Sequence, residues 1–546
     1  MVDGDLTTAV LQLLQLTDSP QYVALRRDHR SSQYLNLAIL FFMQQFRKVY
    51  VGDQATSSSK VYARLEERLA LGDHVAVLGV LVNKILTDLQ LRPSNSDIIT
   101  KALTLFADLA GGYCSGKLML KLEAVHRMLS SHSAADLPFL EDPENARQRT
   151  VFFSTLCKLL FLDESSLTFK AFMAPLTSLL TSLSEAAPSA QMRDALIGAL
   201  RDMRGVVGAC ANRRTYSLFF DWLYPDFTPL FQRAASLFYD APELTTPLLK
   251  LYGELVHNKA QRLTFDSSSP NGILLFRDMS AVLVAYGSRI LEHKVPPGGD
   301  AYVHKFKGIS ICMTVFARAL SGNYVNFGVF ALYGDRALAD CLEVTIQLCL
   351  SMSLTEIFVY PKVTRAYFTL IELLMRNHAT MLVALDTAVL RHICASLQEG
   401  LKSYEVAVSS QCAAALEHLA AFHFAQITEE RERPAKRHLH AHLAAEPQLF
   451  SGQLEVLLHM VVFEDCANQW SLSRPLLALI LTNNGFFARW KEEALTHQAG
   501  NLERQQKLAL AFEKLMTDVQ PTLEAKNRDR FTQNLTLFRH EMKNIF

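Results

Sequence analysis

The stretch GGYCSGKL, residues 111–118, carries the residue types of a phosphate-binding loop, because G-x-x-x-x-G-K is the motif of P-loop nucleotide hydrolases. In those enzymes the loop joins a buried strand to the N-terminus of a helix, and a Ser or Thr after the Lys binds Mg²⁺. Here Leu118 occupies the position of that hydroxyl residue. The residues on either side of the motif must therefore decide whether a nucleotide site is present.

These flanking residues favour two helices over a strand and a helix. Upstream, apolar residues recur at helical spacing over 98–110, after the cap-like Asn95. Downstream, the apolar positions of 118–129 form a second helical stripe. The two glycines at 111–112 then end the first helix, so the stretch is predicted to be the turn of a helical hairpin. The same context argues against Cys114 as the nucleophile of a G-x-C-x-G elbow, which also requires a strand-to-helix turn.

Other catalytic and metal-binding patterns are weak in this sequence. It contains no H-E-x-x-H, G-x-S-x-G or G-x-G-x-x-G motif. Three histidines, His438, His440 and His442, cluster in ERERPAKRHLHAHLAAE (430–446), but on a helix only the first and the last would share a face. The mixed charges around them favour a solvated segment. We therefore predict no enzyme, no metal site and no cofactor.

The elements around these residues are predicted to be helices. Apolar positions at helical spacing occur throughout, most clearly in residues 34–51, 61–71, 74–91, 169–183 and 191–207. Convincing period-2 strands are lacking, and turns containing Pro or Gly separate helices of about 12 to 20 residues. No repeat of fixed spelling is visible, which favours the loosely defined HEAT type. The predicted fold class is therefore all-α, an α-solenoid of HEAT-like helical hairpins.

The size and composition of the chain suit such a repeat protein. Of its 546 residues, 50% are hydrophobic and 20% are charged, so the chain is expected to fold. Lys plus Arg and Asp plus Glu both number 54, so bulk charge points to neither nucleic acid nor membrane as a partner. The nine cysteines are scattered and odd in number, which favours reduced thiols in the cytosol or nucleus. The acidic N-terminus does not fit a signal peptide, and the longest apolar runs are shorter than a membrane span.

One charged segment suggests a division of the chain. In residues 427–446, basic side chains at 431, 433, 436 and 437 are offset by acidic ones at 429, 430 and 432. This pattern is typical of a solvated, flexible connection. We therefore predict HEAT-like repeats over 1–426, a charged connector over 427–446, and C-terminal HEAT-like repeats over 447–546.

Several longer stretches combine aromatic, Asn and Gly residues in a distinctive order. They are LVHNKAQRLTFDSSSPNGILLFRD (255–278), ILFFMQQFRKVYVGDQ (39–54), LRDMRGVV (200–207), FKGISIC (306–312), LSGNYVNFGVFALYGDRAL (320–338), FEDCANQWSLSRPLL (463–477) and KNRDRFTQNLTLFR (526–539). In these stretches the chain resembles the exportin-7 and Ran-binding-protein-16/17 branch of the importin-β-type nuclear transport receptors. The stretches keep the order of that family and nearly span the chain.

The resemblance implies HEAT repeats, binding of the GTP form of the small GTPase Ran, and carriage of protein cargo through nuclear pores. It also implies contacts with nuclear pore proteins and shuttling between nucleus and cytoplasm. The chain resembles the C-terminal half of such a receptor, and the family's N-terminal repeats hold most of the Ran contact. Ran binding is therefore expected to need that other half.

Ten polar residues in or near these stretches are the candidates for contact with a partner. They are Asn258, Arg262, Asn271, Arg277, Asn323, Asn326, Arg474, Lys526, Arg528 and Arg530. Two other functions remain open at this point: a helical-repeat scaffold with no role in transport, and a nucleotide hydrolase built around GGYCSGKL. Sensitivity of cargo binding to Ran-GTP separates transport from scaffolding, and nucleotide turnover that depends on Lys117 would identify the hydrolase.

Overall fold

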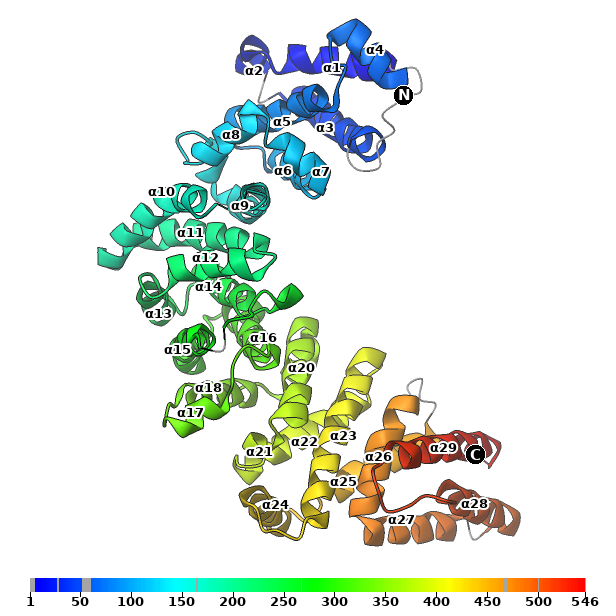
Figure 1. Cartoon of the computed structure of the whole chain (residues 1–546). Helices are drawn as coiled ribbons and strands as arrows, with labels where there is room; N and C mark the ends of the chain where they lie inside the picture. Colours follow the sequence, from blue (N-terminus) through cyan, green and yellow to red (C-terminus); the bar gives the residue numbers. More distant parts are fainter. Residues whose placement is uncertain are drawn as a thin grey trace. The chain divides into compact units, whose positions relative to one another are not determined.

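The computed structural model describes residues 5–26, 29–51, 60–163, 165–266, 268–464, 469–498 and 500–545. Within these ranges the regular elements are helices and no strand occurs, which confirms the predicted all-α solenoid (Figure 1). The helices form two compact units. The first comprises Met1–Lys294 with Gly322–Cys341, and the second comprises Val295–Ser321 with Leu342–Phe546.

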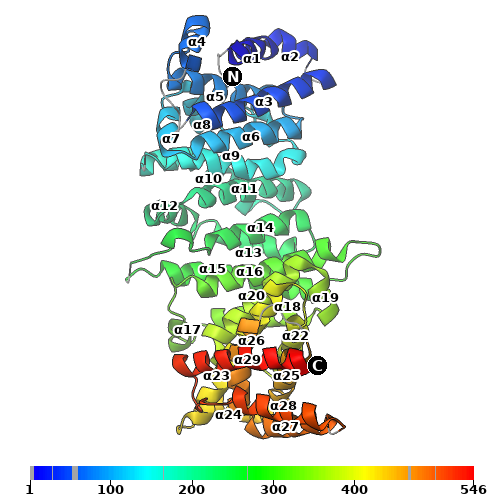
Figure 2. The same ribbon diagram turned by 90° about the vertical axis from the view of Figure 1, so that its right-hand side faces the viewer.

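The first unit contains two layers of helices. One layer is formed by α3, α6, α9, α11 and α14, each of which packs against the next (Figure 2). Helices α5, α8, α10, α13 and α15 form the second layer and pack against the first or against each other. The helices that begin in this unit are α1 (Asp5–Thr17), α2 (Pro20–Arg26), α3 (Arg30–Tyr50), α4 (Lys60–Leu69), α5 (His74–Leu91), α6 (Ser96–Ala110), α7 (Tyr113–Met119), α8 (Glu123–Ser130), α9 (Ala146–Leu160), α10 (Ser166–Glu185), α11 (Ala190–Ala209), α12 (Arg213–Leu223), α13 (Thr228–Leu237), α14 (Pro242–Leu255), α15 (Asn271–Glu292), α17 (Gly328–Leu332) and α18 (Ala337–Leu350).

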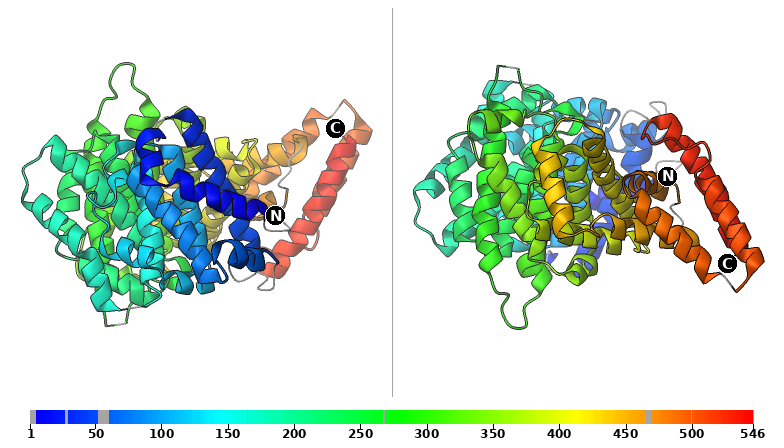
Figure 3. Two further views of the ribbon diagram at one scale, coloured as in Figure 1. Left: turned by 90° about the horizontal axis from the view of Figure 1, so that it is seen from above. Right: turned by 90° about the horizontal axis from the view of Figure 1, so that it is seen from below.

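The second unit repeats this arrangement. Helices α16, α20, α23, α26 and α29 pack in succession, and α22, α25 and α28 lie behind them. The last two helices, α28 and α29, pack against each other at the end of this unit and are coloured orange-red and red in Figure 3. The helices of this unit are α16 (Lys307–Ser321), α19 (Leu354–Val359), α20 (Pro361–Asn377), α21 (Ala379–Leu382), α22 (Thr387–Leu401), α23 (Val406–Thr428), α24 (Pro434–Ala445), α25 (Ser451–Phe463), α26 (Gln469–Thr482), α27 (Asn484–His497), α28 (Leu502–Leu515) and α29 (Ala525–Ile545).

Local sequence fixes several of the helix starts. Before α5 the side chain of Asp73 accepts a hydrogen bond of 2.7 Å from the backbone N–H of Ala76. Before α6, Asn95 does the same for Ile98 at 3.0 Å. Each bond satisfies one of the backbone donors that a helix N-terminus leaves unpaired, so these polar residues set where the helices begin.

A buried cluster of charges joins α5 to the first helices of the chain. Lys84 Nζ lies 2.8 Å from carboxylate oxygens of both Asp18 and Asp88, and it donates a 2.6 Å hydrogen bond to the side chain of Asn36. Arg92 Nη1 lies 2.7 Å from the same Asp88 oxygen. Burial raises the pKa of Asp88, while the charges of Lys84 and Arg92 act in the opposite direction. Opposite charges therefore compensate one another inside the first unit.

Helix α5 is also the one described helix that is long and apolar enough to cross a membrane by length and composition. Half of its length is buried inside the protein. The charged pair of Lys84 and Asp88 lies within it, fully buried and hydrogen-bonded. Both properties are those of a core helix in a folded unit, since a single lipid-facing helix would have no partners for these charges.

Two details of the helices differ from the sequence predictions. The stripe over 118–129 is divided between α7 and α8, because the backbone turns at Leu120–Leu122. Most of the predicted connector over 427–446 is the helix α24, with Leu439 and His442 buried. The whole of that segment lies within the second unit. The domain limits at 427 and 446 stay a proposal.

Candidate partner-binding sites

The ten candidate residues fall into two groups, one in each compact unit. Residues 258–277 and 323–326 belong to the first unit, and residues 474–530 belong to the second. Within each group the side chains divide into those that hold the backbone in place and those that face outward. This division shows which of them could meet a partner.

Arg262 is the structural anchor of the first group, with only 1% of its surface exposed. Its Nη1 donates hydrogen bonds to the backbone oxygens of Val207 at 2.7 Å and Cys210 at 3.0 Å, at the end of α11. Its Nη2 lies 3.2 Å from a carboxylate oxygen of Glu254 on α14, and its guanidinium lies 5.4 Å from the centre of the Tyr216 ring. Arg262 therefore joins α11 to α14 and holds the loop between α14 and α15 in place.

Asn258 and Asn271 also position the backbone in this group. The Asn258 side chain donates a 2.6 Å hydrogen bond to the backbone oxygen of Gly322 and accepts one of 2.8 Å from the N–H of Leu263. Asn271 is half-buried and is the first residue of α15. Pro270 occupies the N-cap position of this helix without a side-chain hydrogen bond.

The remaining three residues of this group are exposed. Arg277 Nε forms an ion pair of 3.1 Å with Asp335. Asn323 adopts a φ of 54°, a backbone conformation that Asn tolerates better than most residues. Asn326 accepts a 3.1 Å hydrogen bond from the N–H of Gly328 at the start of α17. We call the exposed surface of Arg277, Asn323 and Asn326 the loop surface.

In the second group, Arg528 and Arg474 converge on one buried acid, Glu417 of α23. Arg528 of α29 forms an ion pair with Glu417 Oε1 and donates a 2.7 Å hydrogen bond to the backbone oxygen of Leu523. Arg474 of α26 is exposed, and its Nη1 lies 4.0 Å from Glu417 Oε2. Lys526 and Arg530 are exposed on α29, each two residues from Arg528 and therefore on a different side of the helix.

A cleft of about 360 Å³ opens beside these residues, between α23, α26 and α29. It is lined by Ser410, Ala414, Glu417, Trp470, Ser471, Ser473, Arg474, Asp529 and Thr532. We call it the polar cleft. Trp470 stands at this cleft with 68% of its surface exposed, which is unusual for so large an apolar ring and typical of an interface residue.

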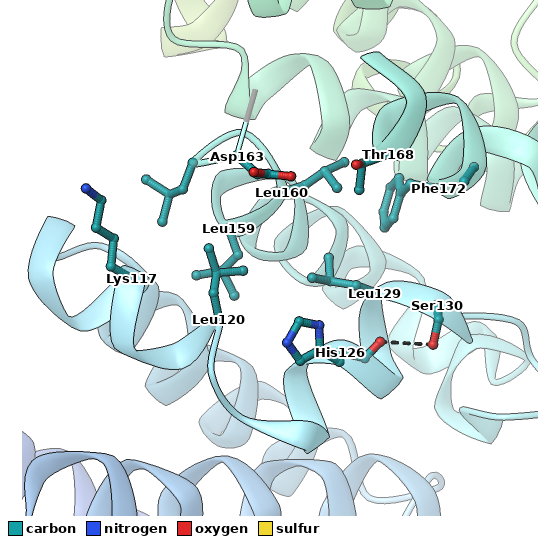
Figure 4. A pocket seen from close by; sticks show the side chains of 12 residues that line it. Lys117, Leu120, His126, Leu129, Ser130, Leu159, Leu160, Asp163, Thr168 and Phe172 are labelled. Atoms are coloured by element: carbon teal, nitrogen blue, oxygen red, sulfur yellow. Dashed lines mark hydrogen bonds between the residues drawn. The ribbon is translucent and has the colours of Figure 1, made fainter. Parts of the chain in front are cut away.

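A pocket of about 630 Å³ lies in the first unit among α7, α8, α9 and α10 (Figure 4). Its lining is mostly apolar and includes Leu120, Leu129, Leu159 and Phe172. Lys117 of the opening motif stands at its edge. The Lys117 ammonium also lies 4.4 Å from the centre of the Tyr113 ring. A cavity of this size suits an apolar ligand or side chain.

The phosphate-loop motif itself lies between two helices. Gly111 ends α6, Gly112 caps α7, and Lys117 belongs to the last turn of α7. The two glycines form the predicted turn between helices, whereas residues 113–118 of the motif belong to α7 rather than to the turn. The strand that a phosphate loop requires is absent here, and Lys117 lies at the wrong end of its helix to meet a phosphate at the N-terminus.

The histidine and cysteine side chains show no metal-binding arrangement within the described residues. Both ring nitrogens of His442 are engaged, with the backbone oxygen of Val383 and with Thr387 Oγ1, each at 2.8 Å. None of the eight described cysteines forms a disulfide, and seven of them are buried. Cys466 lies outside the described residues.

Sequence reasoning missed the apolar side chains that accompany the polar candidates. Tyr333, next to Leu332 at the end of α17, is 78% exposed. Trp470 stands at the polar cleft. Both aromatic residues lie inside the family-like stretches 320–338 and 463–477. Those stretches are the sequence feature from which the two residues could have been predicted.

Comparison with known proteins agrees with the resemblance in these stretches. Residues 1–148 match the family model described as Exportin-7-like, TPR domain. Over 560 residues, covering 99% of the chain, it is 41% identical to exportin-7-B of Xenopus laevis. The chain is a relative of the exportin-7 and Ran-binding protein 16/17 family.

Other relatives show the same pattern. The chain is 39% identical over 561 residues to Ran-binding protein 17 of Homo sapiens, covering 99% of the chain and 51% of that protein. It is 34% identical over 557 residues to exportin-7 of Dictyostelium discoideum, covering 100% of the chain and 54% of that protein. Exportin-7-B is likewise covered over 51% of its length. The chain thus spans about half the length of the curated relatives it matches.

Among solved structures, the chain is similar to an engineered protein known from a crystal structure. The TM-score is 0.42 and the sequence identity 12%, and the match covers 96% of this chain and 98% of the other. This similarity is too weak to bear on function.

Proposed function

We propose that this chain is part of a nuclear transport receptor that binds protein cargo and works with the GTP form of Ran. The observation that carries the proposal is its similarity, over nearly its whole length, to proteins named exportin-7 and Ran-binding protein 17. The stacked helices support it, because a stack that is buried only between neighbours exposes long surfaces that a folded partner can occupy.

The loop surface and the polar cleft are the proposed contact sites for protein partners. In both, exposed polar side chains stand beside exposed apolar ones: Tyr333 near the former and Trp470 at the latter. An aromatic anchor with a polar rim is the usual composition of a protein interface. Arg262 and Arg528 are proposed to position these surfaces, since their side chains are committed to ion pairs and backbone oxygens.

Ran binding is proposed to need repeats outside residues 1–546, because the family resemblance assigns most of the Ran contact to N-terminal repeats. Residues 1–546 alone are proposed to bind cargo weakly. A helical array can keep part of its surface without its other half, since each repeat packs mainly on its neighbours. The proposed location is the nucleus and cytoplasm, with passage through nuclear pores by contact with pore proteins.

The alternative is a helical scaffold without a role in transport. It uses the same exposed surfaces but has no reason to respond to a GTPase. A hydrolase built on residues 111–118 has less support, because its Lys117 stands at the end of a helix in a helical hairpin. We propose that the chain is not an enzyme.

The test is affinity capture from nuclear extract with and without GTP-locked Ran. The bait is the chain fused behind the N-terminal half of a family relative, and residues 1–546 alone serve as the control. A transport receptor should retain a set of proteins whose capture by the fusion changes at least severalfold with Ran. A scaffold should retain the same proteins in both conditions.

A further inference from the structure

Four arginines gather where α9 packs on α11 in the first unit. Arg147 and Arg149 lie in the first turn of α9, and Arg201 and Arg204 lie in the middle of α11. Arg147 is exposed and the other three are half-buried. Burial lowers the pKa of Arg201, and the charges of Arg147, Arg204 and Arg149 lower it further. We call these four residues the arginine cluster.

Close packing of the two helices fixes this cluster in place. A Cβ atom at Gly205 would lie 2.6 Å from the backbone oxygen of Thr150, so α9 approaches α11 more closely than any other residue would allow there. The Thr150 side chain donates a 3.1 Å hydrogen bond to the backbone oxygen of Arg201. The backbone positions that carry the arginines are therefore held close together, and part of the repulsion between their side chains is retained in the fold.

One acid is buried in the cluster, and one arginine engages it. Arg149 Nε lies 2.8 Å from Asp202 Oδ1, and its Nη2 lies 2.5 Å from Oδ2, a bidentate pair. Neither Arg147 nor Arg201 forms an ion pair with any described residue, and Arg201 Nε is buried without a hydrogen-bond partner. Three acidic residues, Glu141, Asp142 and Glu144, precede α9, and none of them forms an ion pair with Arg147 or Arg201. These two arginines therefore keep positive charges that no ion pair compensates.

The N-terminus of α9 adds to the positive potential of the arginine cluster. A helix N-terminus carries about half a positive charge, so acidic residues are favoured in the first turn and basic ones are not. The first turn of α9 has no acidic residue and two arginines. Two helices thus place uncompensated positive charge at one spot, an arrangement that costs folding stability and that an anion would relieve.

We propose that the arginine cluster binds an acidic segment of a partner protein, with carboxylate or phosphate groups accepting hydrogen bonds from Arg147 and Arg201. Arginine suits this task because its planar guanidinium pairs with both kinds of group through two parallel hydrogen bonds. Nucleic acid fits less well, since it requires a long basic track and this chain has a net charge of 0. The site does not depend on the proposed transport function.

The test is binding of a fluorescein-labelled deca-glutamate peptide to residues 1–546, followed by fluorescence anisotropy. The double variant Arg147→Gln/Arg201→Gln should weaken binding about tenfold, as expected for two lost charge-assisted contacts. Its matched control is Arg127→Gln/Arg504→Gln, which removes two exposed arginines elsewhere and should change affinity by less than about twofold. Arg149 is left intact, because its loss would leave Asp202 buried without its cation.

Three outcomes would overturn the proposal. They are no saturable peptide binding at low salt, equal losses in the two double variants, and tighter binding of a ten-nucleotide single-stranded DNA that depends on the same arginines. A deca-peptide of alternating phosphoserine and glycine distinguishes phosphate from carboxylate as the preferred group. Thermal unfolding separates binding from folding: Arg147→Gln/Arg201→Gln should melt no lower than the wild type, since it removes repulsion, and a lower melting temperature would assign the cluster a structural role.

Discussion

Arg528 of α29 forms an ion pair with Glu417 of α23, 111 residues earlier in the chain. Both helices also pack against α26, and Glu417 lines the polar cleft between these three helices. The Arg528 guanidinium donates a second hydrogen bond to the backbone oxygen of Leu523, just before α29 begins. One side chain thus fixes both the position of the last helix and the charge of the cleft beside it.

Arg528→Met should therefore destabilise the second unit. Glu417 would lose its nearest cation while staying buried, and the expected loss is about 2 kcal/mol, typical of a hydrogen bond to a charged group. Urea unfolding followed by circular dichroism measures it. The matched control is Arg530→Met, which removes an exposed arginine from the same helix and should change stability by less than about 0.5 kcal/mol. Equal losses in the two variants would mean that the ion pair does not hold α29.

Lys84→Met should destabilise the first unit by more than Arg528→Met destabilises the second. It would leave Asp88 and Asp18 with Arg92 as their remaining cation inside the first unit, and removing one partner of a buried ion pair typically costs about 3 to 5 kcal/mol. Hydrogen exchange read out by mass spectrometry should show loss of protection in α1, α3 and α5. Lys101→Met, at an exposed position of α6, is the control. Unchanged protection in the Lys84 variant would show that Arg92 alone compensates both acids.

The buried side chain of His423 should make the stability of the protein depend on pH. Burial, with a smaller contribution from His440, lowers its pKa from 6.5 to about 4, and its ring stacks on Phe450 at 4.3 Å. A histidine with a lowered folded-state pKa contributes stability above its unfolded pKa and loses it as pH falls. About 3 kcal/mol should therefore be lost between pH 6.5 and 4.

The variant His423→Phe isolates that contribution. It keeps an aromatic ring against Phe450 and cannot take up a proton, so its stability should fall less steeply between pH 6.5 and 4 than that of the wild type. His540→Phe, at an exposed position of α29, is the control and should follow the wild type. Urea midpoints measured across this range give the comparison, and identical slopes for wild type and His423→Phe would contradict the assignment.

Lys117→Ala tests the phosphate-loop motif directly. We expect no saturable binding of fluorescent ATP or GTP analogues by the wild type, because Gly111 and Gly112 join two helices and Lys117 lies in the last turn of α7. The variant should behave identically in the same fluorescence titration. Nucleotide binding by the wild type that Lys117→Ala abolishes would return the hydrolase to consideration.

The sequence predicts a helix correctly where apolar residues at helical spacing form one buried face. Residues 74–91 were predicted as a helix from apolar spacing, and α5 has those same bounds. The spacing failed at residues 118–129, because apolar residues at helical intervals remain compatible with a turn at Leu120–Leu122. The charge pattern failed at His442. The charged residues around it predicted an exposed side chain, but both of its ring nitrogens are hydrogen-bonded, to the backbone oxygen of Val383 and to Thr387.

The candidate partner-binding sites could be predicted from the sequence only in part. The family-like stretches led to the loop surface and the polar cleft, but they did not distinguish Arg262, buried under the loop, from the exposed Arg277. That difference depends on the backbone oxygens of α11, 52 and 55 residues away, which no local pattern contains. The arginine cluster was missed for the same reason, because Arg147 and Arg201 meet only through the packing of α9 on α11.

The central claim, that this chain belongs to a Ran-dependent transport receptor, is tested most directly by one coupling measurement. A cargo obtained by the affinity capture is titrated against residues 1–546 and against the chain fused behind the N-terminal half of a family relative, each with and without GTP-locked Ran. For the fusion, Ran should change cargo affinity by about 1 to 3 kcal/mol, the usual size of an allosteric coupling. Residues 1–546 alone should bind the cargo weakly and without response to Ran, since a ligand that does not bind cannot shift an equilibrium. Cargo affinity that is indifferent to Ran in both proteins would contradict the transport function, and a full Ran response by residues 1–546 alone would contradict the proposed location of the Ran contact.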